Sequence, residues 1–88
     1  MNEQEGPEGL WQGAEELDLA GLKCPLPSLM TAKALRKLPA GSRLAVRVTD
    51  ALAPLDLRHL CQRDGHSVLA ERKGESEARL LIESGPRA

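Results

Sequence analysis

The chain has almost no aromatic side chains: it contains no Phe, no Tyr and one Trp, Trp11. Proteins that bind single-stranded nucleic acid stack the bases on aromatic rings, so this composition argues against direct nucleic-acid binding. The formal net charge is only −1, but six of the thirteen acidic residues lie in the first eighteen positions. Residues 19–88 hold all twelve Lys and Arg against seven acids, about +5, which favours acidic protein partners.

Long apolar runs are also absent. No stretch approaches the ~20 residues of a membrane span, and the N-terminus lacks the basic and then apolar segments of a signal peptide. Only two cysteines occur, Cys24 and Cys61, far apart in the sequence, which excludes a secreted disulfide scaffold. We therefore expect a cytoplasmic protein with no membrane association and with both thiols free.

The length of 88 residues suits one small domain. Residues 1–14 are rich in Gly, Glu and Gln, and we expect a flexible acidic leader there, with Trp11 either pinned to the body or exposed. The folded domain is expected over residues 15–85. Period-two alternation predicts strands at 16–20, 43–49, 67–73 and 77–84, and helical spacing predicts helices at 25–38 and 54–64.

The resulting order, β-α-β-α-β-β, predicts an α+β fold: a two-layer α/β sandwich with two helices on one face of a four-stranded mixed sheet. The first crossover should join parallel strands, and the last two strands should form an antiparallel hairpin with its turn at Gly74. The residues expected to face the sheet from the first helix are Pro27, Met30, Thr31, Ala34, Leu35 and Leu38. Cys61 falls on the apolar face of the second helix, where a buried small hydrophobe is favoured over a resolving thiol.

The stretch "GLKCPLPSLM" places two prolines at the start of the first helix. Cys24 precedes Pro25 and suits the N-cap position, with Pro25 at N1 and Pro27 at N3. The helix dipole, the one remaining amide N–H at Leu26 and the charge of Lys23 would then lower the pKa of Cys24 and favour its nucleophilic thiolate. The alternative is that the motif is only a buried small residue at a helix start.

Polar residues after the second strand provide candidate support for the cysteine. Cys24 and Asp50 follow two strands that are expected to be parallel, so both should lie at the carboxyl edge of the sheet. There Asp50 is expected to cap the second helix, to orient a partner or to tune the sulfur. His66 is expected to cap carbonyls or to pack. The spacing of the cysteines and histidines does not match a zinc site, so no metal and no cofactor is expected.

Several of these residues together resemble the TusA/SirA-like sulfur carrier family. The matching segments are "LDLAGLKCPLP" with Gly21, "VRVTD", Asp56 and "DGH", spread over about residues 16–84. The chain departs from the family at Ala20, at Ala51, where a proline is usual, and at Leu26 between the two prolines.

The resemblance implies that Cys24 accepts a sulfane sulfur and holds it as a persulfide. It implies protein sulfur donors, either cysteine desulfurases or rhodanese-like sulfurtransferases, and DsrE-like or other sulfurtransferase acceptors. The end uses implied are tRNA thiolation, molybdenum-cofactor assembly and sulfur oxidation. The chain would act as a transfer protein rather than as a complete enzyme. A small carrier that presents its cysteine is expected to be a monomer.

Two leucines near Cys24, Leu26 and Leu29, fall outside the main apolar stripe of the first helix. We expect them to form a small exposed patch for partner docking, although single exposed leucines are common. Two other functions remain open at this point. One is a redox or regulatory module that closes a Cys24–Cys61 disulfide, and the other is an RNA-binding module, by fold analogy alone.

Overall fold

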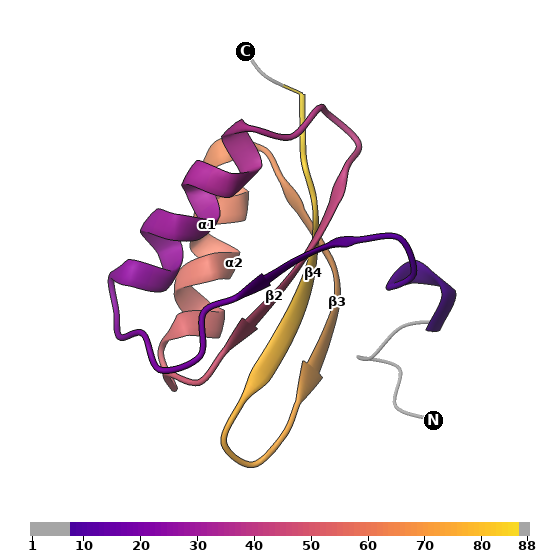
Figure 1. The fold of residues 1–88 in the computed structure, drawn as a ribbon. Helices are drawn as coiled ribbons and strands as arrows, with labels where there is room; N and C mark the ends of the chain where they lie inside the picture. The colour runs from indigo at the N-terminus through magenta and orange to yellow at the C-terminus, as the bar shows by residue number, and fades with distance from the viewer. Residues whose placement is uncertain (1–7, 87–88) are drawn as a thin grey trace.

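The computed structural model describes residues 8–86. Its elements in chain order are a short 3₁₀ turn Glu8–Leu10, β1 Glu15–Asp18, α1 Leu26–Arg36, β2 Arg43–Val48, α2 Ala53–Asp64, β3 Ser67–Lys73 and β4 Ala78–Glu83. Both helices lie on one face of a four-stranded mixed sheet (Figure 1). The predicted α+β two-layer sandwich is therefore confirmed. None of the described helices is long and apolar enough to cross a membrane.

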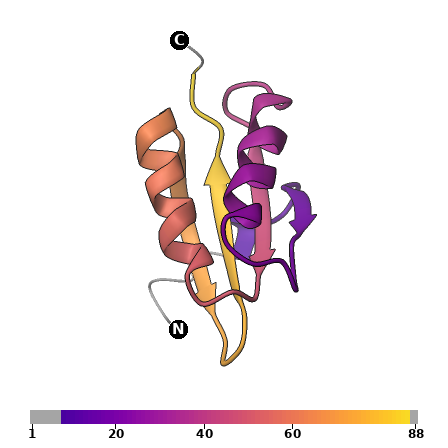
Figure 2. The same cartoon turned by 90° about the vertical axis from the view of Figure 1, so that its left-hand side faces the viewer.

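The strand order in the sheet is β1-β2-β4-β3. β1 pairs with β2 in parallel, whereas β4 runs antiparallel to both of its neighbours, β2 and β3. Because each helix follows one of the two parallel strands, α1 and α2 begin at the same end of the sheet and run side by side (Figure 2). This topology brings together the loops that precede the two helices, and those loops carry the site described below.

The main core lies between the helices and the sheet. Its largest fully buried aliphatic side chains are Leu19, Leu35, Val46, Val48, Leu57, Leu80 and Ile82. Burying each such side chain contributes roughly 1.5–3 kcal/mol. In α1 the buried stripe is Pro27, Thr31 and Leu35. The prediction that Met30 faces the sheet is wrong, since its side chain is 43% exposed. It lies about 100° around the helix from Thr31, beyond the width of the contact with the sheet.

A second, smaller cluster lies on the opposite face of the sheet. Its buried members are Ala45, Ala70 and Leu81, with Leu10, Trp11, Ala14 and Leu69 packed against it. The Arg72 guanidinium lies 4.7 Å from the centroid of the Trp11 ring, and Arg43 Nη1 donates to the Leu10 carbonyl at 2.7 Å. Of the two alternatives for Trp11, these contacts support the one in which it is pinned to the body. Residues 1–7 lie outside the described part.

The second helix ends at the glycine of the "DGH" segment. Gly65 adopts a left-handed conformation with φ of 84°, as a helix-ending glycine commonly does. The next residue, His66, accepts a hydrogen bond at Nδ1 from the Gly85 N–H at 2.9 Å. A side chain at Gly85 would collide with the Gly65 carbonyl. This segment therefore fastens the end of α2 to the chain after β4, and His66 has a structural role there.

Candidate functional site

The loop that carries Cys24 is fastened to the loop that precedes α2. Gly21 has a φ of 85°, which a residue with a side chain rarely adopts, and its N–H donates to Thr49 Oγ1 at 2.8 Å. The Cys24 N–H donates to Asp50 Oδ2 at 2.6 Å. The prediction that Cys24 and Asp50 meet at one edge of the sheet is therefore confirmed. These two hydrogen bonds hold the backbone around Cys24 against the loop that precedes α2.

The start of α1 lies one residue later than predicted. Pro25 occupies the N-cap position and Leu26 is the first helical residue, so Cys24 precedes the cap and Pro27 is the second helical residue. The Leu26 N–H donates to the Lys23 carbonyl at 2.8 Å and closes a turn around Cys24. Within this turn the Cys24–Pro25 peptide bond is cis. The Leu26 N–H is therefore used by the turn and does not face the sulfur.

The sulfur of Cys24 faces carboxylates. The thiol donates to Asp56 Oδ2, with 3.0 Å between Sγ and the oxygen. This hydrogen bond raises the pKa of Cys24 above its ordinary value, and desolvation and the charges of Asp56 and Asp50 act in the same direction. The predicted lowering of the pKa is therefore wrong. Lys23 acts instead on Asp50. The pKa of Asp50 is lowered mainly by the hydrogen bonds from the Cys24 and Leu52 N–H groups, and the charge of Lys23 lowers it further.

Asp50 serves two backbone groups at once. One carboxylate oxygen accepts from Cys24, and the other accepts the Leu52 N–H at 3.1 Å. The N-cap residue of α2 is Leu52, and it is not capped by a side chain. The alternative that Asp50 caps the second helix from the N-cap position is therefore wrong. Asp50 instead joins the Cys24 loop to the start of α2.

Asp56 is the site residue whose role the sequence analysis missed. It appeared there only as part of the family resemblance. Asp56 lies in the first turn of α2, which begins at the same end of the sheet as the Cys24 loop. The signal that could have found it is this position, because parallel strands bring the starts of their following helices together.

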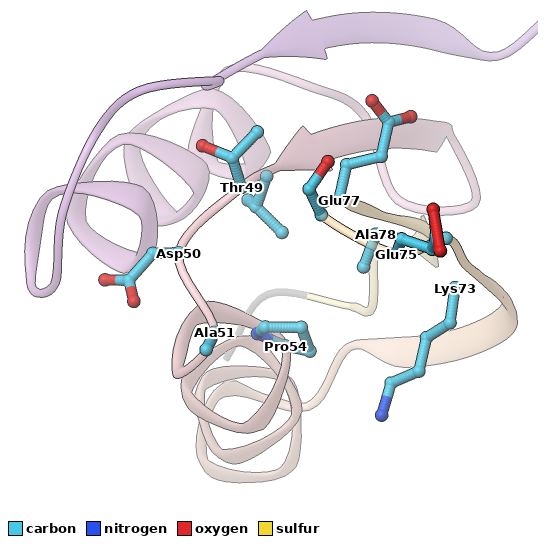
Figure 3. Close-up of a pocket in the computed structure, with 11 residues that line it drawn as sticks. Thr49, Asp50, Ala51, Pro54, Lys73, Glu75, Glu77 and Ala78 are labelled. Atoms are coloured by element: carbon cyan, nitrogen blue, oxygen red, sulfur yellow. The ribbon is translucent and has the colours of Figure 1, made fainter.

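Exposed apolar side chains lie at the starts of the two helices beside the Cys24 loop, and Cys24 is itself exposed. They are Leu26, Leu29 and Met30 on α1 and Leu52 and Leu55 at the start of α2. An open hollow of about 260 Å³ lies on the other side of the α2 start, between Pro54 and the β3–β4 hairpin. Asp50 lines this hollow, but its carboxylate points away from it (Figure 3). Cys24 is not among the residues that line this hollow.

Cys61 lies in a different environment. Its side chain is 2% exposed within the main core, and burial raises the pKa of its thiol to about 11. Both cysteines are free. The interpretation of Cys61 as a buried small side chain is confirmed. Among residues 8–86 no group of three or more His, Cys, Asp or Glu side chains is arranged to hold a metal ion.

Relatives of this chain carry names that refer to sulfur carriage. A protein of Neisseria meningitidis serogroup A named "Putative sulfur carrier protein NMA0882" is 39% identical over 70 residues, which cover 80% of this chain and 95% of that protein. The sulfur carrier protein TusA of Pseudomonas syringae pv. syringae is 42% identical over 60 residues, covering 68% of this chain and 71% of the relative.

The fold also matches a solved structure. The crystal structure of a SirA-like protein from Desulfitobacterium hafniense superimposes with a TM-score of 0.67, covering 81% of this chain and 97% of that one. At 24% identity this likeness concerns the fold alone. The model of the family described as sulfurtransferase TusA matches residues 15–84, nearly the whole described fold. The chain therefore belongs to the TusA/SirA-like family of sulfur carriers.

Proposed function

We propose that Cys24 receives a sulfane sulfur from a donor protein, holds it as a persulfide and passes it to an acceptor protein. The observation that carries this proposal is the contrast in accessibility between the two thiols. Cys24 is exposed on a loop held by Asp50, whereas Cys61 is buried in the core. A lone accessible thiol can hold a transferred sulfur because no second accessible cysteine of the described chain competes to displace it as a disulfide.

The transfer exchanges one sulfur–sulfur bond for another, without net oxidation. The Cys24 sulfur attacks the outer sulfur of the donor persulfide, a new S–S bond forms at Cys24, and the S–S bond of the donor breaks. The donor cysteine leaves as a thiolate and takes up the proton that Cys24 releases. Because a carboxylate is a much weaker base than a thiolate, Asp56 orients the S–H group and does not keep the proton. Delivery to the acceptor is the same exchange in the opposite sense.

The proposed partners follow from the family and from the surface around the sulfur. We propose a cysteine desulfurase or a rhodanese-like protein as donor, and a DsrE-like or other sulfurtransferase as acceptor in a relay such as tRNA thiolation or sulfur oxidation. Leu26 and Leu29 are 46% and 60% exposed and are the proposed docking residues of α1. Gly21, Lys23, Pro25 and Pro27 support the Cys24 loop. We further propose that the carrier is a cytoplasmic monomer.

Persulfide loading provides the test. The protein is incubated with a cysteine desulfurase and L-cysteine, with a rhodanese and thiosulfate, and with inorganic polysulfide, and its intact mass and peptide masses are measured. The wild type is expected to gain the mass of one sulfur atom at Cys24, reversibly on reduction. The Cys24→Ser variant should gain none, whereas the matched Cys61→Ala variant should load as the wild type does. Failure of the wild type with all three donors, or equal loading of Cys24→Ser, would refute the proposal.

A further inference from the structure

The exposed apolar side chains of this protein gather at one place. Within residues 8–86, all the large apolar side chains classed as exposed lie at the starts of α1 and α2. Leu52 and Leu55 are 60% and 49% exposed and lie within one helical turn of Asp56. With Leu26, Leu29 and Met30 they form what we call the collar of Cys24. A gathered apolar surface of this kind is typical of a protein interaction site, whereas isolated exposed leucines are not.

Two carboxylates lie at the same end of the helices as the collar, Asp50 in the loop before α2 and Asp56 in the first turn of α2. Several other acidic side chains form ion pairs: Asp18 and Glu77 pair with Arg47, and Glu71 pairs with Arg58. Neither Asp50 nor Asp56 forms an ion pair with any described residue. Asp56 instead accepts its hydrogen bond from the Cys24 thiol at 3.0 Å. The surface around the nucleophile thus combines exposed apolar side chains with the carboxylates of Asp50 and Asp56, and the charge of Lys23 acts on Asp50.

From this arrangement we infer that the collar binds a protein whose reactive sulfur sits in an apolar rim beside a cationic side chain, and that this cation takes Asp56 away from Cys24. The inference rests on the proposed function, since an exchange between two sulfur atoms requires the donor to cover the surface around Cys24. The occupant is therefore the sulfur-bearing loop of the donor protein. Its positive charge complements Asp50 and Asp56, and its apolar rim covers the leucines of the collar.

The physical consequence is that docking activates the thiol. In the free carrier a thiolate at Cys24 would lie beside the negative charge of Asp56, so the thiol keeps its proton and reacts slowly with small electrophiles. When an Arg, Lys or His⁺ of the donor pairs with Asp56, the hydrogen bond to the thiol is lost and the repulsion falls. Cys24 then releases its proton, which ends on the departing thiolate of the donor. Asp56 is thus a positioning residue whose hydrogen bond to Cys24 depends on whether the partner is bound.

The variant Asp56→Asn tests the inference by two rates that should move in opposite directions. Alkylation of the free protein by the neutral reagent iodoacetamide at pH 8 should become several-fold faster, because the negative charge beside the sulfur is gone. Loading from whichever protein donor loads the wild type should become at least about tenfold slower, because the donor cation loses its partner. Asp64→Asn, the same change at the far end of α2, is the control and should alter neither rate.

The collar is tested by Leu52→Ser and Leu55→Ser. Each should slow loading from the protein donor severalfold, with a much smaller effect on loading from inorganic polysulfide, which has no surface to dock. Gln62→Ser, an exposed position two turns along the same helix, is the control.

If Asp56→Asn moves both rates in the same direction, or loads from the donor as fast as the wild type, the inference is overturned while the proposed function stands. A wild type that no donor loads overturns both.

Discussion

The two cysteines of this chain both hold their protons more tightly than an ordinary cysteine does, but for different reasons. At Cys24 the main cause is a hydrogen bond to one carboxylate on an exposed surface, and at Cys61 it is burial in the core. A contact between two side chains at the surface can be broken by a partner or by one substitution. Burial persists as long as the fold does. The same direction of pKa shift therefore has two causes, and only the one at Cys24 can be removed without unfolding the protein.

The largest expected difference is in alkylation of the folded protein. Cys24 is exposed, whereas Cys61 can react only after the core opens, which costs on the order of 5 kcal/mol for a small domain. We expect iodoacetamide to modify Cys24 faster than Cys61 by on the order of 10³-fold in native buffer. Peptide mass spectrometry over time measures both rates. The ratio should collapse in concentrated urea, and similar rates in native buffer would contradict the burial of Cys61.

A smaller effect is expected in the pH dependence of stability. The pKa of Cys61 is about 11 in the folded protein, against an ordinary 9.0. Between these two values the unfolded chain loses the thiol proton while the folded chain keeps it, so the free energy of unfolding should fall as the pH rises. This part of the fall should reach roughly 2–3 kcal/mol by pH 11 and be absent below pH 9.

Urea titrations at several pH values measure this effect, with Cys61→Ala as the comparison. The variant should lose less stability than the wild type between pH 9 and pH 11, while changes from other titrating groups remain common to both proteins. Parallel curves for the two proteins would show that the buried thiol does not titrate as described.

The smallest expected effect separates the two carboxylates at Cys24. The hydrogen bond to Asp56 is the largest cause of the raised pKa, and the charge of Asp50 is the smallest. Asp50→Asn should therefore shift the midpoint of the alkylation pH profile downward, but less than Asp56→Asn does. The Cys24 loop should stay in place in this variant, because asparagine keeps an oxygen to accept the Cys24 N–H. The profiles of the wild type and both variants give the order. A larger shift for Asp50→Asn would reverse this assignment.

The secondary structure was largely predictable because it depends on local patterns. The strand at 67–73 matches β3 residue for residue, since its flanking Gly65 and Gly74 mark both limits. The start of α1 was misplaced by one residue. Both Pro25 and Pro27 fit the first turn of a helix, so the rule for proline could not choose between two starts. The turn that closes at Leu26 made that choice.

The N-terminal segment shows the limit of composition as evidence. The composition of residues 1–14 left open whether Trp11 is pinned to the body or exposed, because nothing local to Trp11 indicated where its ring would lie. The structure places Trp11 against Ala45 and Leu81 on the outer face of the sheet. Those residues become neighbours only when β2 and β4 pair, so no pattern within the first fourteen residues could reveal the contact.

The sequence by itself determined the order of strands and helices, the family, and a cysteine followed by two prolines at the start of a helix, since each depends on residues close together in the chain. Only the tertiary structure decided what the sulfur faces. Asp56 is 32 residues away from Cys24 and Asp50 is 26 residues away, and both reach it because α2 packs beside α1 on the same sheet. Electrostatic effects on a thiol depend on distances of a few ångströms, and helix packing decides these distances.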